Sequence, residues 1–204
     1  ASTVLTMLGI VSGGIIDPNY TINGLEVAAV WTSYICTILC VVQWRANYYF
    51  GVVTTFLYSI LFYQSGLAAL ATFNAVLVLS LVYGWYRWGP DGKPLPVTDV
   101  KTRNEWEGYF GFAIIVAIGM YGIYELFGTE VVQIDVLIAS VSAAAQLMLD
   151  NKKRQTWIIW AIVNVFSIYL FINQGLYVVA VQYVFFLGNT VAGWFAWTKS
   201  MREK

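Results

Sequence analysis

The most informative side chains of this sequence are aromatic and amide groups that recur at helical spacing inside an uncharged segment. Trp157, Trp160, Asn164, Ser167 and Phe171 follow the spacing i, i+3, i+7, i+10, i+14 and therefore lie on one face of a helix. Asn164 lies near the middle of that segment, where an amide without hydrogen-bond partners would cost several kcal/mol in lipid. We expect this face to line a solute site; the alternative is that Asn164 only bonds a neighbouring helix.

Other apolar segments carry polar and aromatic side chains of the same kinds. Gln182 and Asn189 lie seven residues apart on one helix face. Further candidates for lining the site are Trp31, Tyr34, Thr55, Tyr58, Asn74, Tyr83, Tyr121, Gln146 and Tyr183. A cavity of amides, hydroxyls and indoles suits a planar, hydroxylated solute, and aromatic faces attract a delocalised cation. A sugar or a nucleoside-like vitamin would fit, whereas a phosphate would not, because no Lys or Arg lies within any predicted span apart from Arg87 at the end of one.

Several kinds of chemistry are excluded by what the sequence lacks. It has no histidine, which excludes His-ligated zinc, bis-histidine haem and Ser-His-Asp hydrolysis. It has no G-x-x-x-x-G-K-[ST] loop for ATP, and no acid near the middle of a predicted span to carry a coupled proton. No lysine lies deep in the last span to hold retinal. We expect no enzyme, no cofactor, no metal and no nucleic-acid partner.

The elements that must position these side chains are membrane-spanning helices. The chain is 59% hydrophobic and 11% charged, against roughly 25% charged residues in soluble domains. Residues 46–86 and 155–198 contain no Asp, Glu, Lys or Arg. Each is long enough for two spans, because one span needs about 20 apolar residues. Gln64-Ser65-Gly66 and Asn173-Gln174-Gly175 interrupt them and predict hairpin turns.

We predict seven spans, at residues 23–42, 47–63, 67–87, 106–126, 131–149, 156–173 and 176–198. The fifth is the weakest, because Asp135 and Asp150 enclose only 14 uncharged residues. Residues 89–105 form a linker with three of the four prolines, and Thr102 and Glu105 have the spacing of a capping box. Residues 1–22 are expected to form an outer-face segment, and residues 199–204 a cytoplasmic tail.

Charge predicts the orientation of the seven spans. All 11 Lys and Arg residues fall in the connections after the first, third, fifth and seventh spans. By the positive-inside rule the N-terminus is outside and the C-terminus is cytoplasmic. The four tryptophans Trp85, Trp88, Trp194 and Trp197 lie toward that cytoplasmic side, where we expect an interfacial aromatic belt.

The sequence repeats itself at an offset of 109 positions, so that residues 24–88 superpose on 133–197 without a gap. Matched pairs include Arg45 with Arg154 and Gly84 with Gly193, and Glu26 falls on Asp135. Three helices per repeat would place directly joined repeats in opposite orientations, but the span at 106–130 adds one crossing between repeats 23–88 and 131–198. We therefore predict an all-α integral membrane protein of two parallel three-helix repeats joined by a central helix, a 3+1+3 plan that places substrate near the midplane.

Three motifs carry a resemblance to a known family. Trp157-Ile-Ile-Trp160-Ala-Ile-Val-Asn164, the Gln-Gly-Leu-Tyr hairpin at 174–177 and Tyr83-Gly-Trp85-Tyr-Arg-Trp88 resemble the bacterial PnuC nicotinamide riboside transporters. The resemblance covers residues 24–198. It implies a fold similar to a SWEET transporter and a homotrimer in the bacterial inner membrane. It also implies facilitated diffusion of unphosphorylated nicotinamide riboside, which a separate cytosolic kinase then traps.

The resemblance also implies roles for individual residues. The family binds its substrate with aromatic and amide side chains, a role that falls first on Trp160 and Asn164. The resemblance then implies the same substrate-binding role for Trp157, Gln182, Asn189 and Asn74. Related members take thiamine or riboflavin, and the sequence leaves these open, as it does coupling to an ion. An alternative from another class is a membrane scaffold or receptor subunit, which no vitamin would stabilise against heat.

Overall fold

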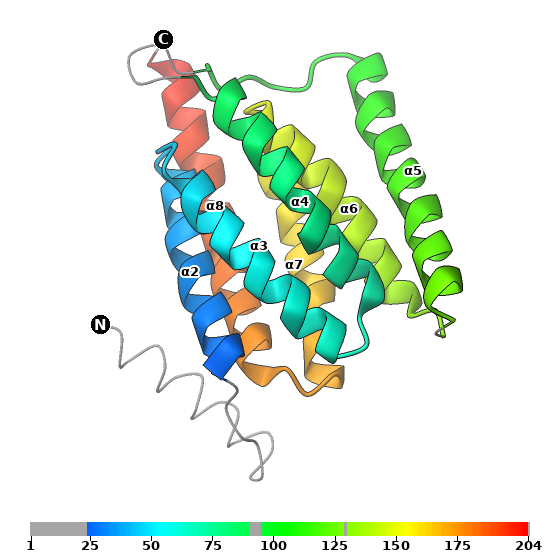
Figure 1. The fold of residues 1–204 in the computed structure, drawn as a ribbon. Coiled ribbons are helices and arrows are strands. Elements are labelled where there is room, and N and C mark those ends of the chain that lie inside the picture. Colours follow the sequence, from blue (N-terminus) through cyan, green and yellow to red (C-terminus); the bar gives the residue numbers. More distant parts are fainter. Residues whose placement is uncertain (1–23, 90–94, 129, 204) are drawn as a thin grey trace.

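The computed structural model describes residues 24–89, 95–128 and 130–203. This part of the chain forms seven α-helices, which confirms the predicted all-α fold (Figure 1). They are α2 (Gly24–Val41), α3 (Asn47–Gln64), α4 (Ala68–Arg87), α5 (Arg103–Phe127), α6 (Gln133–Asp150), α7 (Thr156–Asn173) and α8 (Tyr177–Arg202). The predicted outer-face segment at residues 1–22 lies outside the described residues.

Six of these helices are long and apolar enough to cross a membrane. The exception is α3, which has 18 residues but carries four tyrosines and two threonines. The helix with the shortest uncharged stretch, α6, does form, and 72% of it is buried, against 11% of α5. Because α6 lies in the interior, protein groups rather than lipid surround its two terminal carboxylates.

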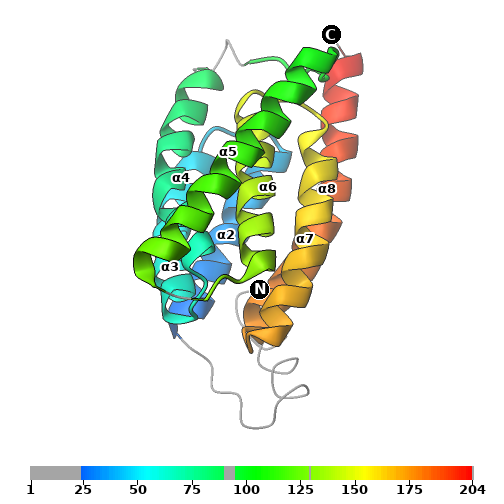
Figure 2. The same cartoon turned by 90° about the vertical axis from the view of Figure 1, so that its right-hand side faces the viewer.

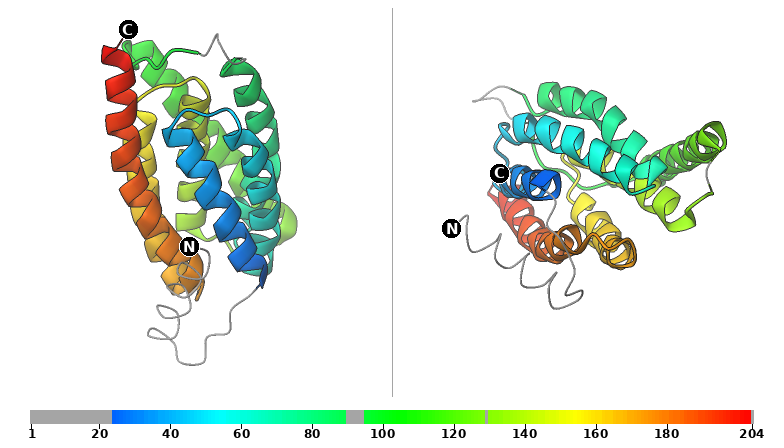
Figure 3. Two further views of the ribbon diagram at one scale, coloured as in Figure 1. Left: turned by 90° about the vertical axis from the view of Figure 1, so that its left-hand side faces the viewer. Right: turned by 60° about the horizontal axis from the view of Figure 1, so that its bottom comes forward.

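The helices other than α5 pack in a ring, in the order α2, α3, α4, α6, α7, α8 and back to α2. Figure 3 shows α2 beside α8, and Figure 2 shows α5 lying across the outside of α4 and α6. We call α2 to α4 the first triplet and α6 to α8 the second triplet. In each triplet the first and third helices run toward the end of the bundle that holds the C-terminus, and the second helix runs back (Figure 1). Between the two triplets, α5 crosses the bundle once (Figure 1).

The connections fall at two ends of the bundle. We call the end with the α3–α4 and α7–α8 turns the hairpin end, and the opposite end the basic end. At the hairpin end, Gly66 and Gly175 have φ of 74° and 72°, a left-handed conformation that glycine adopts without strain. At the basic end, Gln43 and Lys152 have φ of 59° and 48°. Both pairs are 109 residues apart, so the two triplets turn in matching ways.

Two buried acids at the hairpin end connect the triplets crosswise. Glu26 of α2 accepts a hydrogen bond from the Val179 amide at the start of α8, at 3.2 Å. Asp135 of α6 accepts bonds from the Ala69 and Leu70 amides at the start of α4, both at 3.0 Å. The first amides of a helix have no partner within it and carry its positive dipole end. Each acid therefore stabilises the last helix of the other triplet.

The predicted interfacial belt is wrong for Trp88 and Trp197, whose exposed fractions are 2% and 0%. The Trp88 indole donates to the Leu149 carbonyl at 3.3 Å, and the Trp197 indole donates to the Cys40 carbonyl at 3.4 Å. Each bond crosses from one triplet to the other. A buried indole needs a partner for its N–H group, and these carbonyls at the helix ends supply one.

The other two tryptophans of the predicted belt, Trp85 and Trp194, are half-buried beneath arginines. The Arg45 guanidinium lies 3.5 Å from the centre of the Trp85 ring, and that of Arg154 lies 4.4 Å from Trp194. Such cation–π contacts are favourable at a membrane boundary, where one side of the ring is apolar and the other is wet. The basic end is thus closed by matched layers of indoles and arginines.

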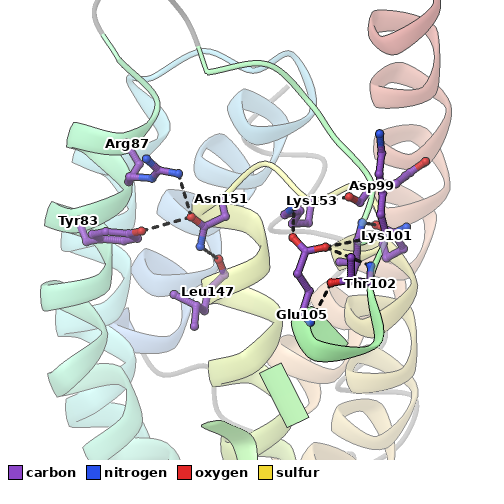
Figure 4. Close-up of polar contacts among 11 residues, drawn as sticks. Tyr83, Arg87, Asp99, Lys101, Thr102, Glu105, Leu147, Asn151 and Lys153 are labelled. Atoms are coloured by element: carbon purple, nitrogen blue, oxygen red, sulfur yellow. Dashed lines mark hydrogen bonds and ion pairs between the residues drawn. The ribbon is translucent and has the colours of Figure 1, made fainter. Parts of the chain in front are cut away.

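The linker before α5 is bonded to the turn between α6 and α7. Thr98 accepts a backbone hydrogen bond from Arg154 at 3.0 Å, and Lys153 forms an ion pair with Glu105 at 2.8 Å (Figure 4). The Thr102 side chain accepts from the Glu105 amide, and the Glu105 side chain accepts from the Thr102 amide. This reciprocal pair confirms the predicted capping box, which fixes where α5 begins.

Two glycines allow bulky side chains to approach a neighbouring helix closely. A Cβ atom at Gly193 of α8 would lie 2.4 Å from the Trp157 ring of α7. A Cβ atom at Gly84 of α4 would lie 2.4 Å from the Tyr48 hydroxyl of α3. These contacts again repeat at the offset of 109, and they leave no space for any larger residue.

We predict that Gly193→Ala destabilises the protein by about 1–3 kcal/mol, because the added methyl group forces the Trp157 ring to move. The measurement is the thermal unfolding temperature of the purified protein in detergent. Gly188→Ala in the same helix is the control, since nothing lies within 4 Å of its added Cβ and alanine favours helix over glycine by about 1 kcal/mol. Equal unfolding temperatures of the two variants would contradict the close packing.

Candidate functional site

A cavity of about 160 Å³ lies between α2, α6, α7 and α8. It is many times larger than the roughly 10–15 Å³ that one water molecule requires. The predicted site residues that line it are Trp157, Trp160, Asn164, Tyr183 and Asn189. Side chains of α2 and α6 complete the wall, among them Ser33, Cys36, Cys40 and Gln146. The lining contains no Asp, Glu, Lys or Arg among the described residues.

The face of α7 supplies polar groups that have no protein partner. Trp157 and Asn164 are 5% and 2% exposed, and both line the cavity. Within the described part of the chain, the Trp157 indole N–H has no acceptor, and the Asn164 amide makes no hydrogen bond. Buried polar groups in proteins nearly always have partners. The Asn164 amide is therefore available to a ligand or to water within the cavity, whereas the Trp157 indole N–H is itself shielded from solvent.

Gln182 lies behind the cavity wall rather than on it. It is fully buried, its side-chain oxygen accepts from the Tyr58 hydroxyl, and its side-chain nitrogen donates to the Ser33 hydroxyl. Ser33 lines the cavity. The amide thus connects α8 with α3 and α2 and fixes the position of a cavity hydroxyl. Asn189, by contrast, lines the cavity and donates weakly to the Thr37 carbonyl at 3.4 Å.

A layer of aromatic rings separates the cavity from the hairpin end. Phe62 and Phe171 stack with centroids 5.3 Å apart and planes 5° from parallel. Tyr58 stacks on Phe62 at 5.1 Å, and Tyr183 of the cavity wall contacts Phe171 at 5.0 Å. Ser167, the remaining member of the predicted α7 face, is fully buried and its hydroxyl has no described partner. The part of that α7 face nearest the hairpin end, with Ser167 and Phe171, therefore packs in the protein core.

Trp31 and Tyr34 of α2 support the cavity wall from behind. The Tyr34 ring packs edge-on against Phe185 at 4.7 Å and Phe186 at 6.1 Å, and Phe186 lines the cavity. Trp31 packs edge-on against Tyr34 at 6.0 Å. In this structure neither of the two α2 rings lines the cavity itself.

Besides Thr55, whose hydroxyl donates to the Val52 carbonyl within α3 at 3.0 Å, three predicted site residues lie away from the cavity. Asn74 is buried and donates to the Leu70 carbonyl within α4 at 2.8 Å. Tyr83 donates to the Asn151 side chain at the basic end, at 3.2 Å (Figure 4). Tyr121 donates to the Gln133 side chain between α5 and α6. The structure therefore does not bring these three together with Asn164.

Sequence reasoning missed the part that α6 plays. Gln146, one of the further candidates, lines the cavity and donates to Asp150 at 2.9 Å, whereas the sequence indicates Asp150 only as a boundary of the span. Asp150 is fully buried. The available signal was their separation of four residues, which places both on one helix face. Nothing in the sequence indicates that this face points inward.

Comparison with known proteins identifies a family of transporters. Residues 23–199 match the family described as nicotinamide mononucleotide transporter. The chain is similar to the nicotinamide riboside transporter PnuC of Escherichia coli (strain K12), with 22% identity that covers 98% of this chain and 94% of that protein. The PnuC protein of Haemophilus influenzae is 25% identical over 84% of this chain and 79% of its own length.

The fold has a solved counterpart. The crystal structure of the vitamin B3 transporter PnuC superposes with a TM-score of 0.77 at 21% identity, and the match covers 99% of this chain and 92% of that chain. At this level of identity the likeness establishes a shared fold and leaves the ligand to be argued from the cavity.

We predict that Gln182→Leu and Asn164→Ala differ sharply in their effect on stability. Gln182→Leu leaves the buried Tyr58 and Ser33 hydroxyls without their partner, which costs about 1–3 kcal/mol. Asn164→Ala breaks no hydrogen bond of the described structure, so the unfolding temperature in detergent should stay close to that of the wild type. A loss of stability in Asn164→Ala as large as that in Gln182→Leu would contradict an unpaired amide at Asn164.

Proposed function

Because this chain belongs to the nicotinamide mononucleotide transporter family, we propose that it carries nicotinamide riboside across the bacterial inner membrane. The relatives with matching sequences are named for that nucleoside. The observation that supports the proposal most strongly is the buried Asn164 amide, which lines the cavity and makes no hydrogen bond within the described part of the chain. An amide can both donate to and accept from the carboxamide of a nicotinamide ring.

The cavity favours the riboside over the phosphorylated mononucleotide. No Lys or Arg lies among its described lining residues, and an unpaired phosphate would be costly to desolvate. A nicotinamide ring attached to ribose is flat and carries a fixed positive charge. The indole faces of Trp157 and Trp160 suit such a ring, because their quadrupoles attract cations. Asn189 and Ser33 are positioned to bond the ribose hydroxyls.

The transport cycle that fits this architecture is rocking of the two triplets about the cavity. We treat them as parallel repeats in a 3+1+3 plan, with α5 as the connecting crossing. Their matching directions and the contacts that recur at an offset of 109 support this plan. The substrate moves by uniport down its concentration gradient, and a separate cytosolic kinase traps it by phosphorylation.

Surface features of the bundle support an orientation in the membrane and an assembly. The described lysines and arginines gather at the basic end, which supports a cytoplasmic position for that end and the C-terminus and an outside position for the N-terminus. The chain assembles as a homotrimer. The support for assembly is the large uncovered surface of α5, of which only 11% is buried within one chain.

We predict that Asn164→Ala weakens nicotinamide riboside binding at least about tenfold, which corresponds to about 1.4 kcal/mol. Isothermal titration calorimetry on the purified proteins measures this, with thiamine and riboflavin as competing candidates. Asn173→Ala is the matched control, because the Asn173 amide is exposed at the hairpin end and bonds only the Tyr169 carbonyl.

An unchanged dissociation constant for a folded Asn164→Ala protein would refute the assignment of this residue. If the wild type binds thiamine or riboflavin more tightly than nicotinamide riboside, that vitamin becomes the proposed substrate and the proposed binding site stays the same. If the wild type binds none of the three vitamins, the result contradicts the transport proposal and favours the alternative of a membrane scaffold or receptor subunit.

A further inference from the structure

Asp150, the last residue of α6, carries a fully buried carboxylate one side chain away from the cavity. One oxygen accepts from the Tyr48 hydroxyl at 3.1 Å and from the Gln146 amide at 2.9 Å. The other oxygen accepts from the Ser80 hydroxyl. The three donors come from α3, α6 and α4, so the carboxylate lies where the first triplet meets α6.

These three partners are neutral donors, so they bond the carboxylate without supplying an opposite charge. Among the described residues, no Lys or Arg forms an ion pair with Asp150. Lys152, two residues along the chain, directs its amine to the Trp88 ring at 4.5 Å and to the Gln43 side chain at 3.3 Å. The other titratable groups that face the carboxylate are the Tyr48 hydroxyl of α3 and the Cys40 thiol of α2, and the Cys36 thiol lies next to both of them. All of them are neutral in their ordinary protonation state.

Gln146 connects this charge to the cavity. Its side-chain nitrogen donates to Asp150, and the residue lines the cavity. The amide oxygen is then the acceptor that remains for a ligand, and the carboxylate strengthens it by polarising the amide. Because the described cavity lining holds no charged residue, the nearby carboxylate in its ionised form gives the cavity a negative potential that a low dielectric screens only weakly.

We propose that Asp150, acting through Gln146, makes the cavity selective for a positively charged ring. In this role Asp150 is a positioning residue that sets the local field and does not touch the ligand. The inference rests on the proposed function, since nicotinamide riboside carries a fixed positive charge on its ring nitrogen. A buried carboxylate without a basic partner inside a membrane is costly, and a cationic substrate supplies the opposite charge when it binds.

The test compares nicotinamide riboside with benzamide riboside, an uncharged ligand of nearly the same shape in which carbon replaces the ring nitrogen. Calorimetry should show that the wild type binds the charged ligand more tightly. Asp150→Asn, which keeps the size and one acceptor oxygen, should weaken nicotinamide riboside binding at least about tenfold. Its affinity for benzamide riboside should change less than about twofold, because an uncharged ring does not respond to the field.

Two control variants separate charge from structure. Ser80→Ala removes one donor from the same carboxylate and keeps the charge. Asp135→Asn removes a buried carboxylate from the other end of α6, far from the cavity. Both should retain the wild-type preference for the charged ligand. Ser80→Asp combined with Asp150→Asn returns a carboxylate to the same contact from α4 and should restore the preference.

Each outcome decides the matter. Equal affinities of the wild type for the two ribosides would overturn the inference. This comparison uses only the wild-type protein, so it does not depend on whether a variant folds. A folded Asp150→Asn protein that loses affinity for both ribosides equally, or for neither, would also overturn it, because either result indicates a purely structural carboxylate. Absence of nicotinamide riboside binding by the wild type would instead overturn the proposed function, and this inference with it.

Discussion

The crosswise capping of helix starts by buried acids determines how the two triplets meet. Glu26 of α2 bonds the first turn of α8, and Asp135 of α6 bonds the first turn of α4. Within a bilayer these amides have no water to bond, so each needs a partner from the protein. Neither triplet supplies this hydrogen-bond acceptor to the first amides of its own third helix. The ring of six helices therefore forms only when the two triplets are in register.

The same requirement for partners locates the site. At the basic end, the buried indoles of Trp88 and Trp197 donate to carbonyls of the opposite triplet, and toward the hairpin end Gln182 is bonded on both sides. Between these bonded layers the cavity contains an indole N–H and an amide without described partners. An unpaired amide on a cavity wall, between layers whose polar groups bond across the two triplets, indicates a place where a ligand completes the bonding.

Local patterns in the sequence predicted the elements well. Uncharged length and glycine turns placed the helices, the Thr102 and Glu105 spacing predicted a real capping box, and helical periodicity brought Trp157, Trp160 and Asn164 to one cavity wall. The sequence did not predict which residues near the helix ends are buried. Burial of Trp88 and Asp150 arises from contacts with helices distant in sequence, and helical spacing carries no information about those contacts.

The central claim is that this cavity passes nicotinamide riboside across the membrane without coupling to an ion. The most direct measurement is uptake of labelled nicotinamide riboside into liposomes that contain only this protein, with no proton or sodium gradient and the membrane potential held at zero. The account predicts saturable uptake that stops when the inside and outside concentrations are equal. Uptake no faster than in protein-free liposomes, or uptake that requires an ion gradient, would contradict it.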